Sequence, residues 1–179
     1  MGLEIEAKIS VSSLKSIEER LVKLGAESIH TVKQKDTYLV DNEGFIKNSG
    51  IGLRLRRQEE KEGELFILTF KGPKLGGRFK SRQEVEIRVS DFDAALQIFL
   101  GLGYIPSVTV EKIRKIWKWD YCSVCLDEVM KLGYYVEIEG PSEEQVHKVL
   151  NQLDLADQPH ISSGYAKLTA EAEHRVPKN

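Results

Sequence analysis

The sequence of 179 residues lacks several features that would place it in a specialised class of protein. It has no apolar run near the roughly 20 residues that a membrane-spanning helix needs. Its N-terminus shows no basic stretch followed by an apolar stretch, the pattern of a secretory signal. Its formal net charge of −2 argues against a nucleic-acid binder that relies on overall positive charge. We therefore expect a cytoplasmic protein that binds neither membranes nor nucleic acids.

Cysteine is also scarce, with only Cys122 and Cys125 in the chain. Their C-x-x-C spacing would suit a redox pair or half of a zinc site. Zinc usually takes four ligands, however, and the sequence has no second C-x-x-C and no H-x-x-x-H. A redox C-x-x-C usually opens a helix, whereas these residues lie in a predicted strand. We expect two reduced and largely buried thiols.

The composition, 41% hydrophobic and 30% charged, is that of an ordinary globular protein of one domain. Apolar residues recur at helical spacing in four segments, which predicts helices at about 14–24, 92–102, 142–153 and 165–174. Gly25 and Gly103 follow the first two as stop signals, and Ser142 with Gln145 has the form of a capping box.

Apolar and polar residues alternate in eight further segments. The predicted strands are residues 3–9, 35–41, 52–58, 65–71, 83–89, 110–120, 122–129 and 134–140. Strands outnumber helices and most successive pairs are close enough for hairpins, which indicates an α+β fold with a mainly antiparallel sheet. Closure into an eight-stranded antiparallel β-barrel, with amphipathic helices packed outside, would remove the sheet edges. The last helix is expected to lie over one end of the barrel.

Two segments of similar pattern indicate an internal repeat within this single domain, residues 1–179. Residues 4–8 (EIEAK) precede a predicted helix that ends in Leu-Gly, and residues 84–88 (EVEIR) precede another with the same ending. We interpret halves of about 1–82 and 83–170 as closing together into one barrel. A coincidence of short patterns would explain the same observation.

Each predicted strand has one charged and one apolar face, because alternate residues on a strand point to opposite sides. The charged faces carry seven carboxylates and seven cations: Glu4, Glu6, Glu84, Glu86, Asp127, Glu137, Glu139, Lys8, Arg54, Arg56, Lys71, Arg88, Lys112 and Arg114. A half-buried sheet with its charges in water is the ordinary interpretation. The amphipathic helices, however, need an apolar surface beneath them, which leaves the charged face as the inside of the closed sheet.

An interior with so many charges is costly unless they are paired, hydrated or bound to a ligand. Glutamates two residues apart on a strand lie roughly 6.5–7 Å apart, so their side chains can converge on a metal ion. Mg²⁺ and Mn²⁺ prefer such oxygen ligands. Arginine matches phosphate oxygens in pairs and lysine adds compact positive charge. The constellation therefore predicts a site for a polyphosphate with a bound divalent metal.

In these motifs the sequence resembles the CYTH family, also called triphosphate tunnel metalloenzymes. The N-terminal E-x-E-x-K of that family stands at residues 4–8. Six further elements follow in order: Leu53-Arg54-Leu55-Arg56, Thr69-Phe70-Lys71, Glu84-Val85-Glu86, Lys112-Ile113-Arg114, Leu126-Asp127 and Glu137-Ile138-Glu139. The resemblance covers residues 1 to about 170, and the Lys112-x-Arg114 element together with the chain length is most similar to the class IV adenylate cyclase-like branch.

The resemblance implies a closed tunnel that holds a triphosphate and Mg²⁺ or Mn²⁺. It implies metal ligands at Glu4, Glu6, Glu137 and Glu139, supported by Asp127, Glu84 and Glu86. It implies phosphate ligands at Lys8, Arg54, Arg56, Lys71, Lys112 and Arg114, and Arg88 lies on the same predicted face. The expected catalytic residues are Glu4, Glu6, Lys8, Lys112 and Arg114.

The reaction stays open at this point. The family includes class IV adenylate cyclases, thiamine triphosphatases and inorganic triphosphatases, so the resemblance implies either cyclisation of ATP or hydrolysis of a triphosphate. The substrate is then ATP, inorganic triphosphate or thiamine triphosphate. A non-catalytic module that binds polyphosphate or a nucleotide would explain the basic residues equally well and the glutamates less well. A homodimer through the outer surface is a further expectation.

Overall fold

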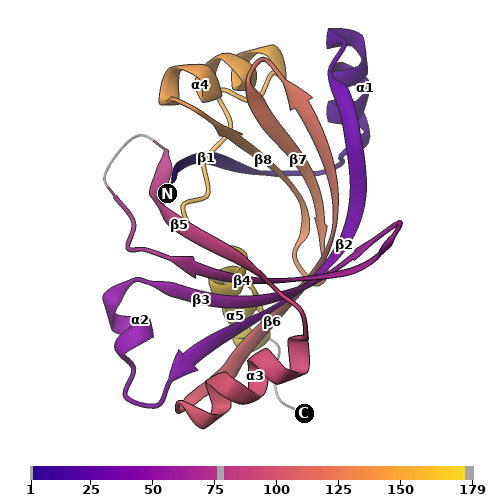
Figure 1. Ribbon diagram of the computed structural model, residues 1–179. Helices are drawn as coiled ribbons and strands as arrows, with labels where there is room; N and C mark the ends of the chain where they lie inside the picture. Colours follow the sequence, from indigo (N-terminus) through magenta and orange to yellow (C-terminus); the bar gives the residue numbers. More distant parts are fainter. Residues whose placement is uncertain (1, 76–78, 176–179) are drawn as a thin grey trace.

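The computed structural model describes residues 2–75 and 79–175, which form one closed β-barrel with helices around it (Figure 1). The elements in chain order are β1 (Gly2–Val11), α1 (Lys15–Leu24), β2 (Glu27–Asp41), α2 (Phe45–Ser49), β3 (Gly52–Glu60), β4 (Gly63–Lys71), β5 (Lys80–Val89), α3 (Phe92–Gly101), β6 (Tyr104–Trp119), β7 (Cys122–Val129), β8 (Gly133–Gly140), α4 (Glu143–Gln152) and α5 (Tyr165–Arg175). Among these elements, no helix is long and apolar enough to cross a membrane.

The eight strands follow one another around the barrel in the order β1-β5-β4-β3-β2-β6-β7-β8, and every neighbouring pair is antiparallel. The predicted α+β fold with a closed eight-stranded barrel is therefore confirmed. This order is unchanged when strands β1–β4 are exchanged with β5–β8, as a repeat of two halves requires. The division of this single domain into two similar halves stays a prediction.

Helices cover the apolar outer face of the sheet in two places, as the sequence predicted, whereas Phe70 of β4 and Val85 and Ile87 of β5 are exposed on that face. One core unites Ile17 and Leu21 of α1 and Val149 of α4 with Leu126 and Ile138 of β7 and β8. A second core lies beneath α2 and α3, where Leu39, Ile46 and Leu53 are buried against Leu96 and Phe99. Because both cores use outward-facing residues, the charged faces of these strands are left to line the interior.

Helix α5 instead packs against residues that point inward. Its first residue, Tyr165, is buried together with Val110, Val129 and Tyr135, and Tyr38 packs against this group. The segment before it is tied to the barrel, because the amide of Ile161 donates to the carbonyl of Lys8 at 2.8 Å. A helix can touch the inner face of a barrel only at an opening, so α5 covers one end.

The predicted elements differ from the observed ones mainly in length. Strands β2 and β6 begin at Glu27 and Tyr104, earlier than the predicted starts at 35 and 110. Helix α2 was not predicted, because its five residues are too few for a periodic pattern. Its first turn is held by the carboxylate of Asp41, which accepts hydrogen bonds from the amides of Phe45 and Ile46 at 2.7 and 2.6 Å.

Candidate active site

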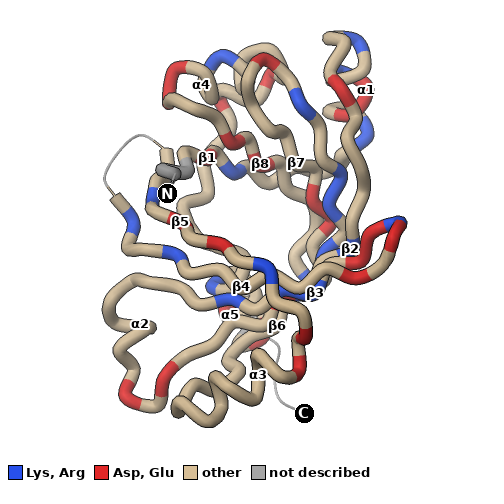
Figure 2. Tube along the Cα trace, viewed as in Figure 1, with Lys and Arg blue, Asp and Glu red and all other residues tan. Residues whose placement is uncertain are grey.

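The barrel encloses a polar cavity of about 330 Å³. It is lined by Glu6, Lys8, Tyr38, Arg54, Arg56, Lys71, Arg82, Glu84, Glu86, Lys112, Arg114, Glu137, Glu139, Gly164 and Tyr165. Twelve of these fifteen residues are charged, and seven of the twelve are cations. Figure 2 shows how charged positions recur along the strands around the central opening, whereas α3 is almost free of them. The interior is thus built for a charged ligand.

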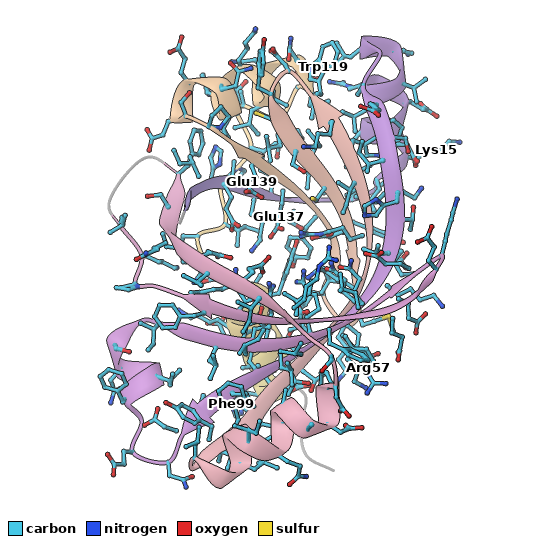
Figure 3. All side chains as sticks on the ribbon, in the orientation of Figure 1. Lys15, Arg57, Phe99, Trp119, Glu137 and Glu139 are labelled. Atoms are coloured by element: carbon cyan, nitrogen blue, oxygen red, sulfur yellow. The ribbon has the colours of Figure 1, made fainter. Side chains whose placement is uncertain are left out.

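One side of the cavity, which we call the acidic wall, consists of Glu6 on β1, Glu84 on β5 and Glu137 and Glu139 on β8. Strands β1 and β8 pair so that Glu6 lies opposite Glu139 and Lys8 opposite Glu137. Figure 3 shows Glu137 and Glu139 pointing into the central opening, whereas the labelled Lys15, Trp119 and Phe99 lie outside it. Cross-strand register therefore brings together glutamates that are far apart in the sequence.

Glu139 is the carboxylate of this wall that depends least on protein partners. Within the described chain it makes no hydrogen bond or ion pair, and it stays accessible to solvent in the cavity. Partial burial, followed by repulsion from Glu6 and Glu84, raises the pKa of Glu139. Like charges so placed are stabilised by a cation between them.

The donor set of the acidic wall fits a hard divalent cation. All its ligating atoms are carboxylate oxygens, the type that Mg²⁺ and Mn²⁺ prefer. Among the side chains that the structure describes, which do not include that of Glu4, no three ligating groups are already gathered at one point. Mg²⁺ usually keeps several waters and binds through one or two carboxylates together with phosphate oxygens, so the wall fits such an ion without a complete protein cage.

The opposite side, the basic wall, is formed by Arg54 and Arg56 on β3 and Lys112 on β6. These three cations surround Asp36 of β2, which is fully buried. Arg56 binds its carboxylate in a fork, from Nε to Oδ1 at 2.6 Å and from Nη2 to Oδ2 at 2.8 Å. Lys112 Nζ lies 3.2 Å and Arg54 Nη1 3.6 Å from Oδ2. The chain itself thus supplies the counter-charge of this wall.

Burial has a large effect on Lys112. It lowers the pKa of Lys112 to about 8, and the attraction of Asp36 offsets that shift only in part. Arg54 keeps its charge, because Asp36 raises its pKa against the opposing effect of burial. Its Nη2 also donates to Thr69 Oγ1 and Glu86 Oε1, both at 2.9 Å. The basic wall therefore contains one cation that titrates near neutral pH.

Two further groups join the walls. Lys71 is paired with Glu84, and Arg82 Nε lies 3.1 Å from the same carboxylate. Lys8 Nζ lies 3.1 Å from Glu137 and 3.9 Å from Glu6. Burial alone would lower the pKa of Lys8, but Glu137 and Glu6 raise it. Lys8 is therefore charged at neutral pH, and all three cations lie at the edge of the acidic wall.

Tyr165 connects α5 with the site. Its hydroxyl donates to Asp127 Oδ2 at 2.8 Å, and Asp127 in turn holds Arg114 in a fork with distances of 2.7 and 2.5 Å. The ammonium groups of Lys8 and Lys112 lie 4.1 and 5.3 Å from the centre of its ring. The C-terminal helix thus helps to place three cations that sequence reasoning had assigned to the phosphates.

The structure brings together most of the predicted site residues, with three exceptions. The side chain of Glu4 lies outside the described residues, although its backbone pairs with Arg82. Arg88 is exposed near the end of β5 and does not line the cavity. Asp127 is fully buried behind Arg114 and does not line it either. The last two are therefore placed where they do not reach a ligand in the cavity directly.

Sequence reasoning missed four residues at the site: Asp36, Tyr38, Arg82 and Tyr165. Asp36 and Tyr38 lie two apart in a predicted strand, so alternation could have found them. Arg82 precedes the predicted start of its strand at residue 83, and β5 begins earlier, at Lys80. Tyr165 comes from a helix, and only the docking of α5 brings it to the barrel.

The two cysteines are free and buried, as expected. Cys122 packs in the outer core, whereas Cys125 pairs in register with Glu137 and so faces the interior. Residues three apart on a strand point to opposite sides, so the two thiols face different surroundings. Burial, the largest effect, raises the pKa of each thiol to about 11.

Comparison with known proteins identifies the family. The model of the CYTH domain matches residues 2–166. The chain belongs to the CYTH family. The resemblance drawn from the motifs is thus confirmed over almost the whole chain, and the barrel described above is the CYTH tunnel fold.

The names of proteins similar to this chain mention two activities, adenylate cyclase and triphosphatase. A protein of Methanocaldococcus jannaschii named "Putative adenylate cyclase MJ0240" is 28% identical over 175 residues, which cover 93% of this chain and 98% of that protein. The PH1819 protein of Pyrococcus horikoshii OT3 superposes with a TM-score of 0.83 at 25% identity, over 94% of this chain and 98% of the other.

A more distant structure is HpAC1 from Hippeastrum, for which a dominant triphosphatase activity is described. It superposes with a TM-score of 0.67 at 16% identity, over 99% of this chain and 98% of the other. At that identity the likeness shows the fold alone. Family membership therefore does not identify the activity of this CYTH protein.

Proposed function

We propose that this CYTH protein is a divalent-metal-dependent triphosphatase whose substrate lies inside the barrel. The observation that carries the proposal is the division of one cavity into an acidic and a basic wall. A simple cation site has no use for Arg54, Arg56 and Lys112, and a simple anion site has no use for the glutamates. A triphosphate with a bound metal ion uses both.

The basic wall is suited to the phosphate oxygens. Arg54, Arg56 and Lys112 are buried and line the cavity, so little water screens their charge. Guanidinium forks bind phosphate oxygens in pairs, and such charge-assisted hydrogen bonds are the strong ones. Lys8, Lys71 and Arg114 extend this positive surface across the cavity. Phosphoryl transfer depends mainly on such positioning and charge neutralisation.

The acidic wall would hold the metal ion through Glu6, Glu137 and Glu139, with Glu4 proposed beside them. A bound divalent metal would neutralise charge on the phosphates and orient water. In hydrolysis, a water oxygen forms a bond to the terminal phosphorus while the bridging P–O bond breaks. A carboxylate of the wall takes the proton of that water. With inorganic triphosphate the products are orthophosphate and pyrophosphate.

Hydrolysis of a compact triphosphate fits the cavity better than cyclisation of ATP. The described lining contains only two aromatic side chains on which a base could stack, Tyr38 and Tyr165. The ring of Tyr165 is already approached by Lys8 and Lys112, and it packs against Tyr135 in a T-shaped arrangement with a centroid distance of 5.2 Å. Tyr38 packs in the same cluster. We therefore propose inorganic triphosphate as the preferred substrate.

A second candidate is adenylate cyclase, which the name of the Methanocaldococcus relative favours. In that reaction the ribose 3′-hydroxyl attacks the α-phosphorus of ATP, and pyrophosphate leaves. The base would then lie outside the described lining. A binding module without turnover is the third candidate, and the glutamates speak against it because they would weaken the binding of an anion without metal.

One experiment separates the three candidates. Purified protein is incubated with inorganic triphosphate, ATP or thiamine triphosphate, with Mg²⁺ or Mn²⁺ and with chelator as the control, and the products are separated by chromatography. Orthophosphate released fastest from inorganic triphosphate, and only with metal, supports the proposal. Cyclic AMP with pyrophosphate would establish the cyclase instead. Binding without turnover under all conditions would leave the binding module.

A further inference from the structure

Asp36 differs from the other acidic groups of the interior in its position. It is 0% exposed, and it does not line the cavity that its three cationic partners line. In the sheet it lies opposite Arg56 of β3 and Val110 of β6. It therefore stands between β3 and β6, the two strands that carry its three cationic partners. It can therefore affect a ligand only through other side chains.

The contacts of Asp36 are shared unequally between its two oxygens. Among the described residues, Oδ1 accepts only from Arg56, whereas Oδ2 lies 2.8 Å from Arg56 Nη2, 3.2 Å from Lys112 Nζ and 3.6 Å from Arg54 Nη1. One oxygen thus fixes the spacing of three cations on two strands. Burial alone would raise the pKa of Asp36, but Lys112, Arg56 and Arg54 hold it well below its usual range.

We propose that Asp36 is a positioning residue that holds Arg54, Arg56 and Lys112 in the arrangement in which they bind the phosphates; this inference rests on the proposed function. Without it, three buried cations would repel one another, and the Arg56 fork would lose its partner. Preorganised charge is effective because it needs no rearrangement during the reaction. Asp36 therefore contributes to turnover without touching the substrate.

An alternative role for Asp36 is that of a counter-charge only, and this role predicts an effect of opposite sign. If Asp36 only lowered the positive charge of the wall, Asp36→Asn would tighten the binding of the anion and leave turnover unchanged. If Asp36 positions the cations, the same change lowers kcat by tenfold or more, and KM for inorganic triphosphate does not improve. The matched control is Glu59→Gln, which removes an exposed carboxylate from β3, the strand of Arg54 and Arg56.

The pH profile gives a second readout. Two carboxylates lie near Lys112 on its own and the neighbouring strand, Glu111 on β6 and Asp36 on β2. The charges of Arg56, Arg114 and Asp127 also affect the pKa of Lys112. The ring of Tyr165 faces its ammonium group. Because Asp36 is the strongest attraction that favours the charged form of Lys112, its loss moves the alkaline fall in kcat/KM to a lower pH. Glu59→Gln leaves that fall in place.

The experiment compares wild type, Asp36→Asn, Asp36→Glu and Glu59→Gln, with thermal melting to check folding and calorimetry of inorganic triphosphate binding. Asp36→Glu keeps the negative charge but displaces the carboxylate. It should therefore also have a lower kcat, while kcat/KM falls at the same alkaline pH as in the wild type. This variant carries the test if Asp36→Asn does not fold. Wild-type kcat in either folded variant overturns the inference. If wild type turns over no substrate, the proposed function fails. The positioning role of Asp36 is then tested by calorimetry alone: weaker binding of inorganic triphosphate by Asp36→Glu supports it, and equal or tighter binding overturns it.

Discussion

The acidic and basic walls of the cavity solve the problem of crowded like charges in different ways. On the basic wall, the buried carboxylate of Asp36 lies within 3.6 Å of three cations. On the acidic wall, Glu139 has no ion-pair partner among the described residues, and Glu6 and Glu84 raise its pKa. The basic wall thus contains its own counter-charge, Asp36, whereas within the described part of the chain Glu139 of the acidic wall has a counter-charge only when a cationic ligand is bound.

This difference teaches how the two walls contribute to stability. Breaking a buried ion pair leaves an uncompensated charge and costs about 3–5 kcal/mol. Removing a carboxylate that is repelled by neighbouring carboxylates instead stabilises the fold, because the repulsion is lost. The pair of Arg56 with Asp36 should therefore be needed for folding as well as for binding, and Glu139 for function alone.

The largest expected effect tests the acidic wall. Glu139→Gln should lower turnover of inorganic triphosphate at least about a hundredfold, because a proposed metal ligand is lost. The same change should leave the melting temperature of the metal-free protein unchanged or higher, because repulsion from Glu6 and Glu84 is relieved. Steady-state rates with Mg²⁺ and a thermal melt with chelator measure the two effects. Full activity in the folded variant would remove Glu139 from the site.

The next effect tests the basic wall with two neighbours on one strand. Arg56→Met should destabilise the protein by about 3 kcal/mol, since it breaks the buried fork with Asp36, and should raise KM about tenfold or more. Arg57→Met on the opposite face is the control, because Arg57 pairs with Glu64 at 3.5 Å near the surface. Denaturant unfolding and substrate titration measure both variants. Equal behaviour of the two would contradict the assignment of Arg56 to the interior.

A smaller effect comes from pH. The pKa of Lys112 is lowered to about 8, so the basic wall loses one charge as the pH rises through that value. Affinity for inorganic triphosphate should fall severalfold between pH 7 and 9. Stability from this group should rise from about pH 8 to 10.5, because the unfolded chain binds the proton more tightly than the folded one there.

The control for this pH effect is Lys112→Met. It should bind more weakly at every pH and lose the part of the pH dependence that Lys112 causes. An identical alkaline limb in Lys112→Met would assign the limb to another group, such as the substrate itself. Calorimetric titrations across this pH range make the comparison.

The smallest effect lies outside both walls and sets a baseline. Tyr121 at the β6–β7 turn is 91% exposed and has a φ of 64°, a left-handed conformation that disfavours residues with a side chain. Tyr121→Gly should stabilise the protein by about 0.5–1 kcal/mol and leave turnover unchanged, because Asp-Gly suits this type of turn. A loss of activity here would show that distant changes also reach the cavity.

Much of the fold followed from local patterns. Alternation found all eight strands, because polar residues on the inner face alternate with apolar residues on the outer face in each of them. It missed residues 27–34 of β2 and 104–109 of β6, where residues such as Lys33 and Thr109 are exposed. It also missed α2, whose single turn depends on Asp41 rather than on periodicity.

The sequence by itself determined the chemistry of the site: paired glutamates and basic residues recur at a period of two, and any closed sheet must place them on one face. Only the tertiary structure decided which of them meet. Closure set Glu6 opposite Glu139 and placed Asp36 among Arg54, Arg56 and Lys112. It also left Arg88 outside the cavity. The reason is that alternation fixes the face of a residue, whereas register, strand order and the docking of α5 fix its neighbours, and these depend on contacts between distant parts of the chain.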